Sequence, residues 1–157
     1  MAVANPTLQV GVRFLAGVYL DMVVRRSVAV PLLLDGSQLL DYLKLERIYR
    51  LAKKVVVEYL VQSYNGRSAG CFRVWHEVKE TVRRLGLPSA YAQQAVKDAV
   101  ETYNAWATAG ERPPEIRKVS PYTDEMAWRL DSATALSIRL MSGRHIAELW
   151  PHKRFWL

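Results

Sequence analysis

The sequence predicts an α+β fold in which three helices interrupt a small antiparallel β-domain. Three observations predict it: residues 25–36 have the composition of a strand, residues 38–109 follow helical periodicity, and residues 126–149 return to short alternating runs. A lone first strand must pair with another strand, so we expect it to join the later ones. The chain has 157 residues, half of them hydrophobic, which suits one domain or two small interleaved ones.

The first strand is expected at residues 25–36, where β-branched residues alternate before a run of leucines. Pro31 cannot donate a backbone hydrogen bond, so it predicts an edge strand or a bulge. Residues 1–24 are interpreted as an N-terminal extension. Their apolar run is interrupted by Arg13 and Asp21 and is too short to span a bilayer.

The first helix is expected to run from Gln38 for about seven turns and to end near Asn65 and Gly66. Apolar residues recur every three or four positions, which predicts one buried stripe. That stripe is Leu40, Leu43, Ile48, Leu51, Ala52, Val55, Tyr59 and Leu60. The opposite arc carries a row of cations at Arg47, Arg50 and Lys54.

The second helix is expected over residues 71–86, with Gly86 as its C-terminal cap. Its predicted inner stripe is Phe72, Trp75, Val78, Val82 and Leu85. Another face of the same helix carries His76, Lys79 and Arg83.

The third helix is expected to begin at Pro88 and to stop at Gly110. Its inner face is dominated by small residues, which predicts close packing against a neighbouring helix. The face is Ala92, Ala95, Val96, Ala99, Val100, Tyr103 and Trp106. Gln93 and Lys97 lie on the other side of this helix and are candidates for contact with nucleic acid.

A proline-rich segment, GERPPEIRKVSP, follows the third helix and predicts an extended arm. Prolines stiffen such an arm and so pre-position its cations, Arg112, Arg117 and Lys118. Beyond it, Ser142 and Gly143 predict a hairpin turn between the last two strands.

The net charge, the cysteine count and the spacing of the histidines limit the functions that the chain could have. The net charge is +7 and is spread along the chain, which fits equally a polyanionic partner such as nucleic acid and a merely basic soluble domain. The single cysteine, Cys71, excludes a disulfide framework and a cysteine-based zinc site within this chain, and it fits a reducing, cytoplasmic location. His76, His145 and His152 lack metal-ligand spacing, and there is no Gly-rich phosphate loop or nucleophile elbow.

Three stretches together resemble the N-terminal half of archaeal TnpB proteins, also called OrfB. They are RRSVAVPLLLDGSQLLDYLKLERIYRLAKKVVVEYL, RRLGLPSAYAQQAVKDAVETYNAW and RPPEIRKVS, and the resemblance covers about residues 24–157. TnpB proteins are transposon-encoded, RNA-guided nucleases. The order of the stretches, more than any single motif, makes the resemblance specific.

The resemblance implies a split, barrel-like β wedge domain at residues 25–36 and 119–157. Residues 37–118 would then be an inserted helical recognition bundle with its basic, proline-rich arm. In the family, a nuclease domain with three acidic residues and a Cys-rich zinc ribbon follows these parts. This chain departs from the family there, so we expect no catalysis from it and no cofactor, and a separate nuclease chain is one partner that this implies.

The expected function is therefore to hold guide RNA or an RNA–DNA heteroduplex, with target DNA as a partner and no membrane involved. The candidate nucleic-acid-binding residues are Arg47, Arg50, Lys54, Gln93, Lys97, Arg112, Arg117, Lys118, Lys153 and Arg154. Two alternatives stay open for the chain: a stand-alone DNA- or RNA-binding regulator, and a functionless folded remnant of a transposase-like gene. For the cations, the alternative is an ordinary solvated helix face.

Overall fold

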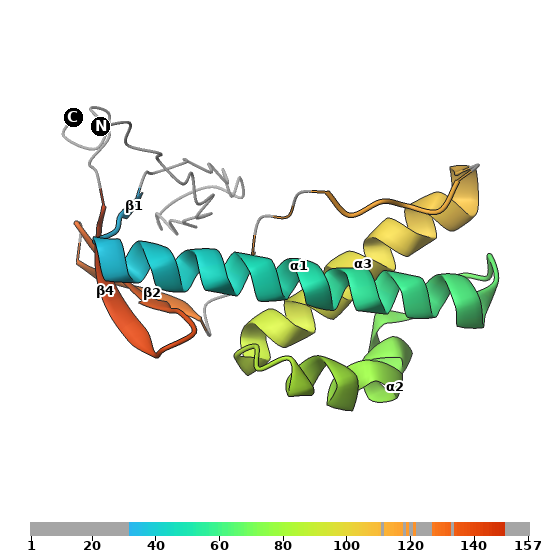
Figure 1. Cartoon of the computed structure of the whole chain (residues 1–157), viewed down its shortest axis with the longest axis horizontal. Helices are drawn as coiled ribbons and strands as arrows, with labels where there is room; N and C mark the ends of the chain where they lie inside the picture. The colour runs from blue at the N-terminus through green and yellow to red at the C-terminus, as the bar shows by residue number, and fades with distance from the viewer. Residues whose placement is uncertain are drawn as a thin grey trace, which may run out of the picture.

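In the residues that it describes, the computed structural model contains three helices and four strands, which confirms the predicted α+β class (Figure 1). The residues that the structure describes are 32–110, 112–117, 119, 121, 127–132 and 134–149. Most of the predicted first strand, residues 25–31, therefore lies outside them.

The four strands form one open antiparallel sheet in the order β1-β4-β3-β2. Their bounds are β1 Leu32–Leu33, β2 Trp128–Ser132, β3 Ala135–Arg139 and β4 Arg144–Leu149. Strand β1 precedes the helices in the chain, yet it pairs with β4, which follows them: Leu32 lies opposite Leu149. The hairpin between β3 and β4 turns at Ser142 and Gly143, as the sequence predicts.

Helix α1 spans Gly36–Tyr64, and local capping fixes both of its ends. The Asp35 carboxylate accepts the Gln38 backbone N–H at 2.8 Å, and the Gln38 side chain accepts the Asp35 N–H at 3.1 Å. This reciprocal capping box satisfies two backbone donors that the helix itself leaves open. At the other end Asn65 adopts φ 48°, the left-handed conformation that ends helices.

The buried face of α1 differs from the predicted stripe. The buried residues are Tyr42, Leu45, Tyr49, Ala52, Val56, Val57, Leu60 and Tyr64. Leu40, Leu43 and Leu51 are instead 70%, 48% and 47% exposed. The tyrosine rings are buried because their hydroxyls find partners: Tyr49 donates to Asp98, and Tyr64 donates to Glu77 at 2.9 Å.

Helix α2 spans Cys71–Arg84, and a narrow stripe of valines packs it into the core. Val74, Val78 and Val82 are buried at a spacing of four residues, whereas the predicted stripe contained Phe72, which is 80% exposed. The prediction counted the larger aromatic ring as the core residue. Leu85 is the C-cap residue of α2, and Gly86 follows it with φ +82°, the left-handed conformation that ends a helix, in agreement with its predicted capping role.

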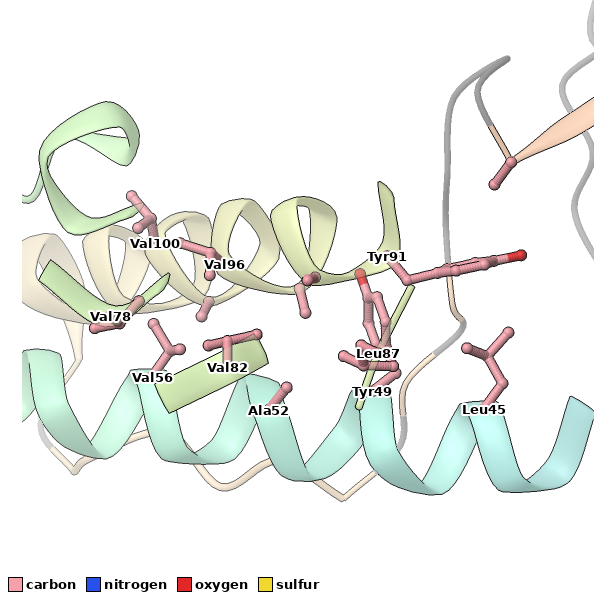
Figure 2. Close-up of a cluster of buried hydrophobic side chains, with 14 of the residues drawn as sticks. Leu45, Tyr49, Ala52, Val56, Val78, Val82, Leu87, Tyr91, Val96 and Val100 are labelled. Carbon is pink, nitrogen blue, oxygen red and sulfur yellow. The ribbon is translucent and has the colours of Figure 1, made fainter. Parts of the chain in front are cut away.

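Helix α3 spans Ser89–Ala109, and its small-residue face packs against α1. Ala92, Ala95 and Ala99 are fully buried, as predicted. Figure 2 shows Val56 of α1, Val78 and Val82 of α2, and Val96 and Val100 of α3 gathered in this core. The small side chains of α3 thus let three helices share one compact interior.

Hydrogen bonds tie two of the helices directly to the sheet. The Gln38 side chain of α1 donates to the Ile146 carbonyl oxygen of β4 at 3.1 Å. The Tyr91 hydroxyl of α3 donates to the Arg139 carbonyl oxygen of β3 at 2.9 Å. Burial raises the pKa of this hydroxyl, so it remains a donor at all ordinary pH values.

Candidate nucleic-acid interface

The extended arm that follows α3 lies along α1. Figure 1 shows it running back beside α1 after α3 ends. The Arg50 guanidinium of α1 donates through Nη1 to the Arg117 carbonyl oxygen at 3.3 Å. Ile116 and Val119 are partly buried against the core, so apolar packing holds the arm in place on both sides of this contact.

The contact brings together two sets of predicted cations that are far apart in the sequence. We call the combined set the α1–arm surface: Arg47, Arg50, Lys54, Arg112 and Arg117. Arg50 is half-buried, and the other four are exposed. Five cationic side chains thus stand on a helix and on an extended segment that lies beside it.

Ion pairs neutralise this surface only in part. Lys54 lies 3.8 Å from Glu58, and Arg117 lies 2.7 Å from Glu115, with all four side chains exposed. Exposed pairs of this kind are weak and are readily exchanged for another anion. Within the described part of the chain, Arg47 and Arg112 form no ion pair.

The other predicted residues do not join the α1–arm surface. Gln93 and Lys97 are exposed on α3, and no hydrogen bond or ion pair with a described residue links them to the arm. Burial raises the pKa of the Cys71 thiol, while the charge of Lys97 acts in the opposite direction, so Lys97 lies near the start of α2. Lys118, Lys153 and Arg154 lie outside the described residues.

Sequence reasoning missed an aromatic and cationic face on α2. Its members are Phe72, Trp75, His76, Lys79 and Arg83, and we call it the α2 outer face. The sequence placed the three polar members together and assigned the two aromatic residues to the inner stripe; Trp75 does pack against the core and is half-buried, whereas Phe72 is exposed. The four-residue spacing of the valines was the signal that identifies the true inner stripe and leaves Phe72 outside.

A cluster of Asp41, Ser142 and His145 joins α1 to the β3–β4 hairpin. The Asp41 carboxylate accepts the Ser142 backbone N–H at 2.8 Å and its hydroxyl at 2.7 Å, and His145 Nε2 lies 2.8 Å from the same hydroxyl. The hydroxyl has one hydrogen, which it gives to Asp41, so it accepts from His145 Nε2–H. In a hydrolase triad the carboxylate orients the far ring nitrogen instead, so this cluster is arranged to fix the hairpin.

The electrostatics of Asp41 agree with a structural role. Burial alone would raise the pKa of its carboxyl, but the two hydrogen bonds from Ser142 and the nearby charge of His145 outweigh burial and lower that pKa. The ionised carboxylate is therefore the form that the fold stabilises.

Two further features bear on function. Within the described ranges, no group of three or more His, Cys, Asp or Glu side chains is placed to hold a metal ion. Across the same residues, no helix combines the length and the apolar character that crossing a bilayer requires.

Comparisons with protein-family models, with curated proteins and with solved structures found no match for the chain.

Proposed function

We propose that the chain is a non-catalytic, nucleic-acid-binding part of a TnpB-like protein. It holds guide RNA or an RNA–DNA heteroduplex by contacting the phosphate backbone. The observation that supports this most directly is the Arg50–Arg117 contact, because it brings the arm, with its own cations, against the middle of the cationic row of α1.

The residue types and their layout support backbone recognition. Arginine presents a planar fork of donors that matches phosphate oxygens, and four of the five cations of the α1–arm surface are arginines. Cations that follow a helix and a parallel arm form rows that suit a duplex backbone. Such contacts position a duplex without reading its sequence, which suits a system that leaves sequence to base pairing.

The domain arrangement belongs to the same proposal. Residues 25–36 and 119–157 form the barrel-like wedge, and residues 37–118 form the recognition insertion. The pairing of β1 with β4 supports this division, because the strand before the helices joins one that follows them.

The proposal is tested by the full chain's preference among duplexes. Fluorescence anisotropy at matched salt would compare an RNA hairpin, an RNA–DNA hybrid and B-form DNA, each of about 20 base pairs. We expect RNA and hybrid to bind more tightly, because an A-form backbone differs in shape from B-DNA. Equal affinity for all three would reduce the interaction to general charge attraction and would refute the proposal.

A second measurement tests the non-catalytic part. The same duplexes, incubated with the chain and magnesium ions, are expected to remain intact on denaturing gels. Metal-dependent cleavage that co-purifies with the chain through several columns would contradict this part of the proposal.

A further inference from the structure

Phe72 is the most exposed large apolar side chain of the described residues. It is 80% exposed, more than Leu40 at 70% or Ile146 at 64%. The ring is nevertheless supported, because it makes an edge contact with the His76 ring at a centroid distance of 4.5 Å. A contact of this kind, one helical turn apart, gives an exposed ring a preferred orientation.

The neighbours of Phe72 on this face are two further rings, Trp75 and His76, followed by two cations, Lys79 and Arg83. Trp75 is half-buried, and the Arg83 guanidinium lies 5.9 Å from the centre of its ring. Lys79 stands one turn beyond Trp75 on the same side of the helix. From Phe72 to Arg83 the face extends about 16 Å, since a helix rises about 1.5 Å per residue.

The acidic residues of α2 leave this face net positive. Glu80 lies at its margin and pairs with Arg83 at 3.3 Å. Glu77 is engaged elsewhere, because it accepts hydrogen bonds from Tyr59 and Tyr64 of α1 and from Arg73. At the end that carries Phe72, Lys97 and Glu101 of α3 both act on Cys71 with opposite charges, so α3 adds little net charge there.

Rings that adjoin cations fit one chemistry better than others. Proteins that bind single-stranded nucleic acid stack bases on aromatic rings and hold the connecting phosphates with basic side chains. The fully buried centre of a protein interface is depleted of charged residues, which lie mainly at its polar rim. Here Lys79 and Arg83 follow the rings directly along the helix, and the Arg83 guanidinium reaches back to the Trp75 ring.

We propose that the α2 outer face binds unpaired bases of a single-stranded nucleic acid. A base stacks on Phe72, Trp75 and His76 flank it, and Lys79 and Arg83 contact the adjoining phosphates. This inference rests on the proposed function in one respect, namely that the partner is a nucleic acid. It adds a site for single strands that is separate from the α1–arm surface.

The test uses the full chain and a single-stranded RNA of about 12 nucleotides with one 2-aminopurine. Stacking on Phe72 is expected to quench the 2-aminopurine fluorescence. Phe72→Ala should weaken binding about 5- to 150-fold and relieve the quenching, whereas Phe72→Tyr should keep both. The salt slope should not change in Phe72→Ala, because stacking releases no counterions.

Two control variants separate stacking from other effects. Lys79→Gln with Arg83→Gln should flatten the salt slope by about 1.4, two single-strand phosphate contacts at about 0.7 each. Ile146→Ala removes a comparably exposed apolar side chain from β4 and should leave binding unchanged. Phe72→Ala is expected to fold, because the ring is exposed and alanine favours helix; far-UV circular dichroism would verify this.

The outcomes distinguish the two proposals. The single-strand site is refuted if the chain binds no single strand at low salt, if Phe72→Ala binds like the wild type, or if Ile146→Ala causes an equal loss. An unchanged Phe72→Ala would point to a protein as the occupant of this face. If Phe72→Ala behaves as expected but no duplex preference exists, the duplex function fails and the single-strand site stands.

Discussion

Neutralising the centre of the α1–arm surface should weaken the salt dependence of duplex binding. The variant changes Arg47, Arg50 and Arg117 to glutamine. Each phosphate contact contributes about 0.7 to 0.9 to the slope of log affinity against log salt, so three contacts amount to about 2.1 to 2.7. Between about 50 and 200 mM salt, that difference corresponds to a change of about 20- to 40-fold in the affinity ratio of wild type to variant.

The assay is anisotropy with the RNA–DNA hybrid over a salt series, and a matched variant controls for net charge. Arg84, Arg129 and Arg139 are exposed on α2 and the sheet, and changing them to glutamine removes the same total charge. This control should shift the slope by much less than one, because salt screens exposed charges beyond about 8 Å. Thermal melting would check the fold, since Arg50→Gln also removes a hydrogen bond worth about 1 kcal/mol. Equal slopes in the two triple variants would refute the assignment of the α1–arm surface.

Three further predictions concern stability. Ala99→Leu should destabilise the chain by about 1 to 3 kcal/mol in urea unfolding, because Ala99 is fully buried between helices. Ala105 is exposed, so Ala105→Leu should change the stability little. Equal effects of the two substitutions would contradict the close packing of α3. The pKa of the Asp41 carboxyl is lowered in the folded chain. The ionised carboxylate therefore stabilises the fold at pH values above the ordinary aspartate pKa of about 3.9, and this stabilisation is lost as the pH falls through the lower, folded-state pKa. Asp41→Asn should therefore melt with a weaker acid dependence than the wild type, and an unchanged acid dependence would show that another group is responsible. Gly110→Ala should lower the melting temperature because its Cβ would collide with the Trp106 indole. Gly36→Ala, at the first residue of α1 with open space around it, should not lower it. The reverse order would contradict the packing of Trp106 over the helix end.

The parts of the fold that the sequence predicts correctly are those that local chemistry decides. Asp35 and Gln38 cap α1 within four residues, and Gly86 ends α2 with a positive φ that other residues rarely adopt. The alternation after residue 126 and the Ser142–Gly143 turn likewise specify a hairpin without help from distant residues.

The buried face of α1 could not be predicted in the same way. Leucine is ordinarily a better core residue than tyrosine, so the pattern favoured Leu40 and Leu43. Burial of Tyr49 and Tyr64 depends on acceptors that α2 and α3 supply, and these appear only once the helices are packed.

The candidate interface likewise has one part that the sequence predicts and one part that it does not. The spacing of Arg47, Arg50 and Lys54 places them on one side of a helix, and the structure agrees. The contact of Arg50 with Arg117 spans 67 residues, and that of Asp41 with Ser142 spans 101. The periodicity of residues within one helix or strand carries no information about contacts between residues so far apart in the sequence.

The pairing of Leu32 with Leu149 also determines when the sheet can be completed during synthesis. The two residues are 149 − 32 = 117 positions apart, so at about 5 to 20 residues per second the ribosome makes β4 roughly 6 to 23 s after β1. The three helices contact one another through residues made within that interval, and their core is able to form first. For several seconds a nascent chain therefore carries a packed helical unit beside an edge strand that still awaits β4.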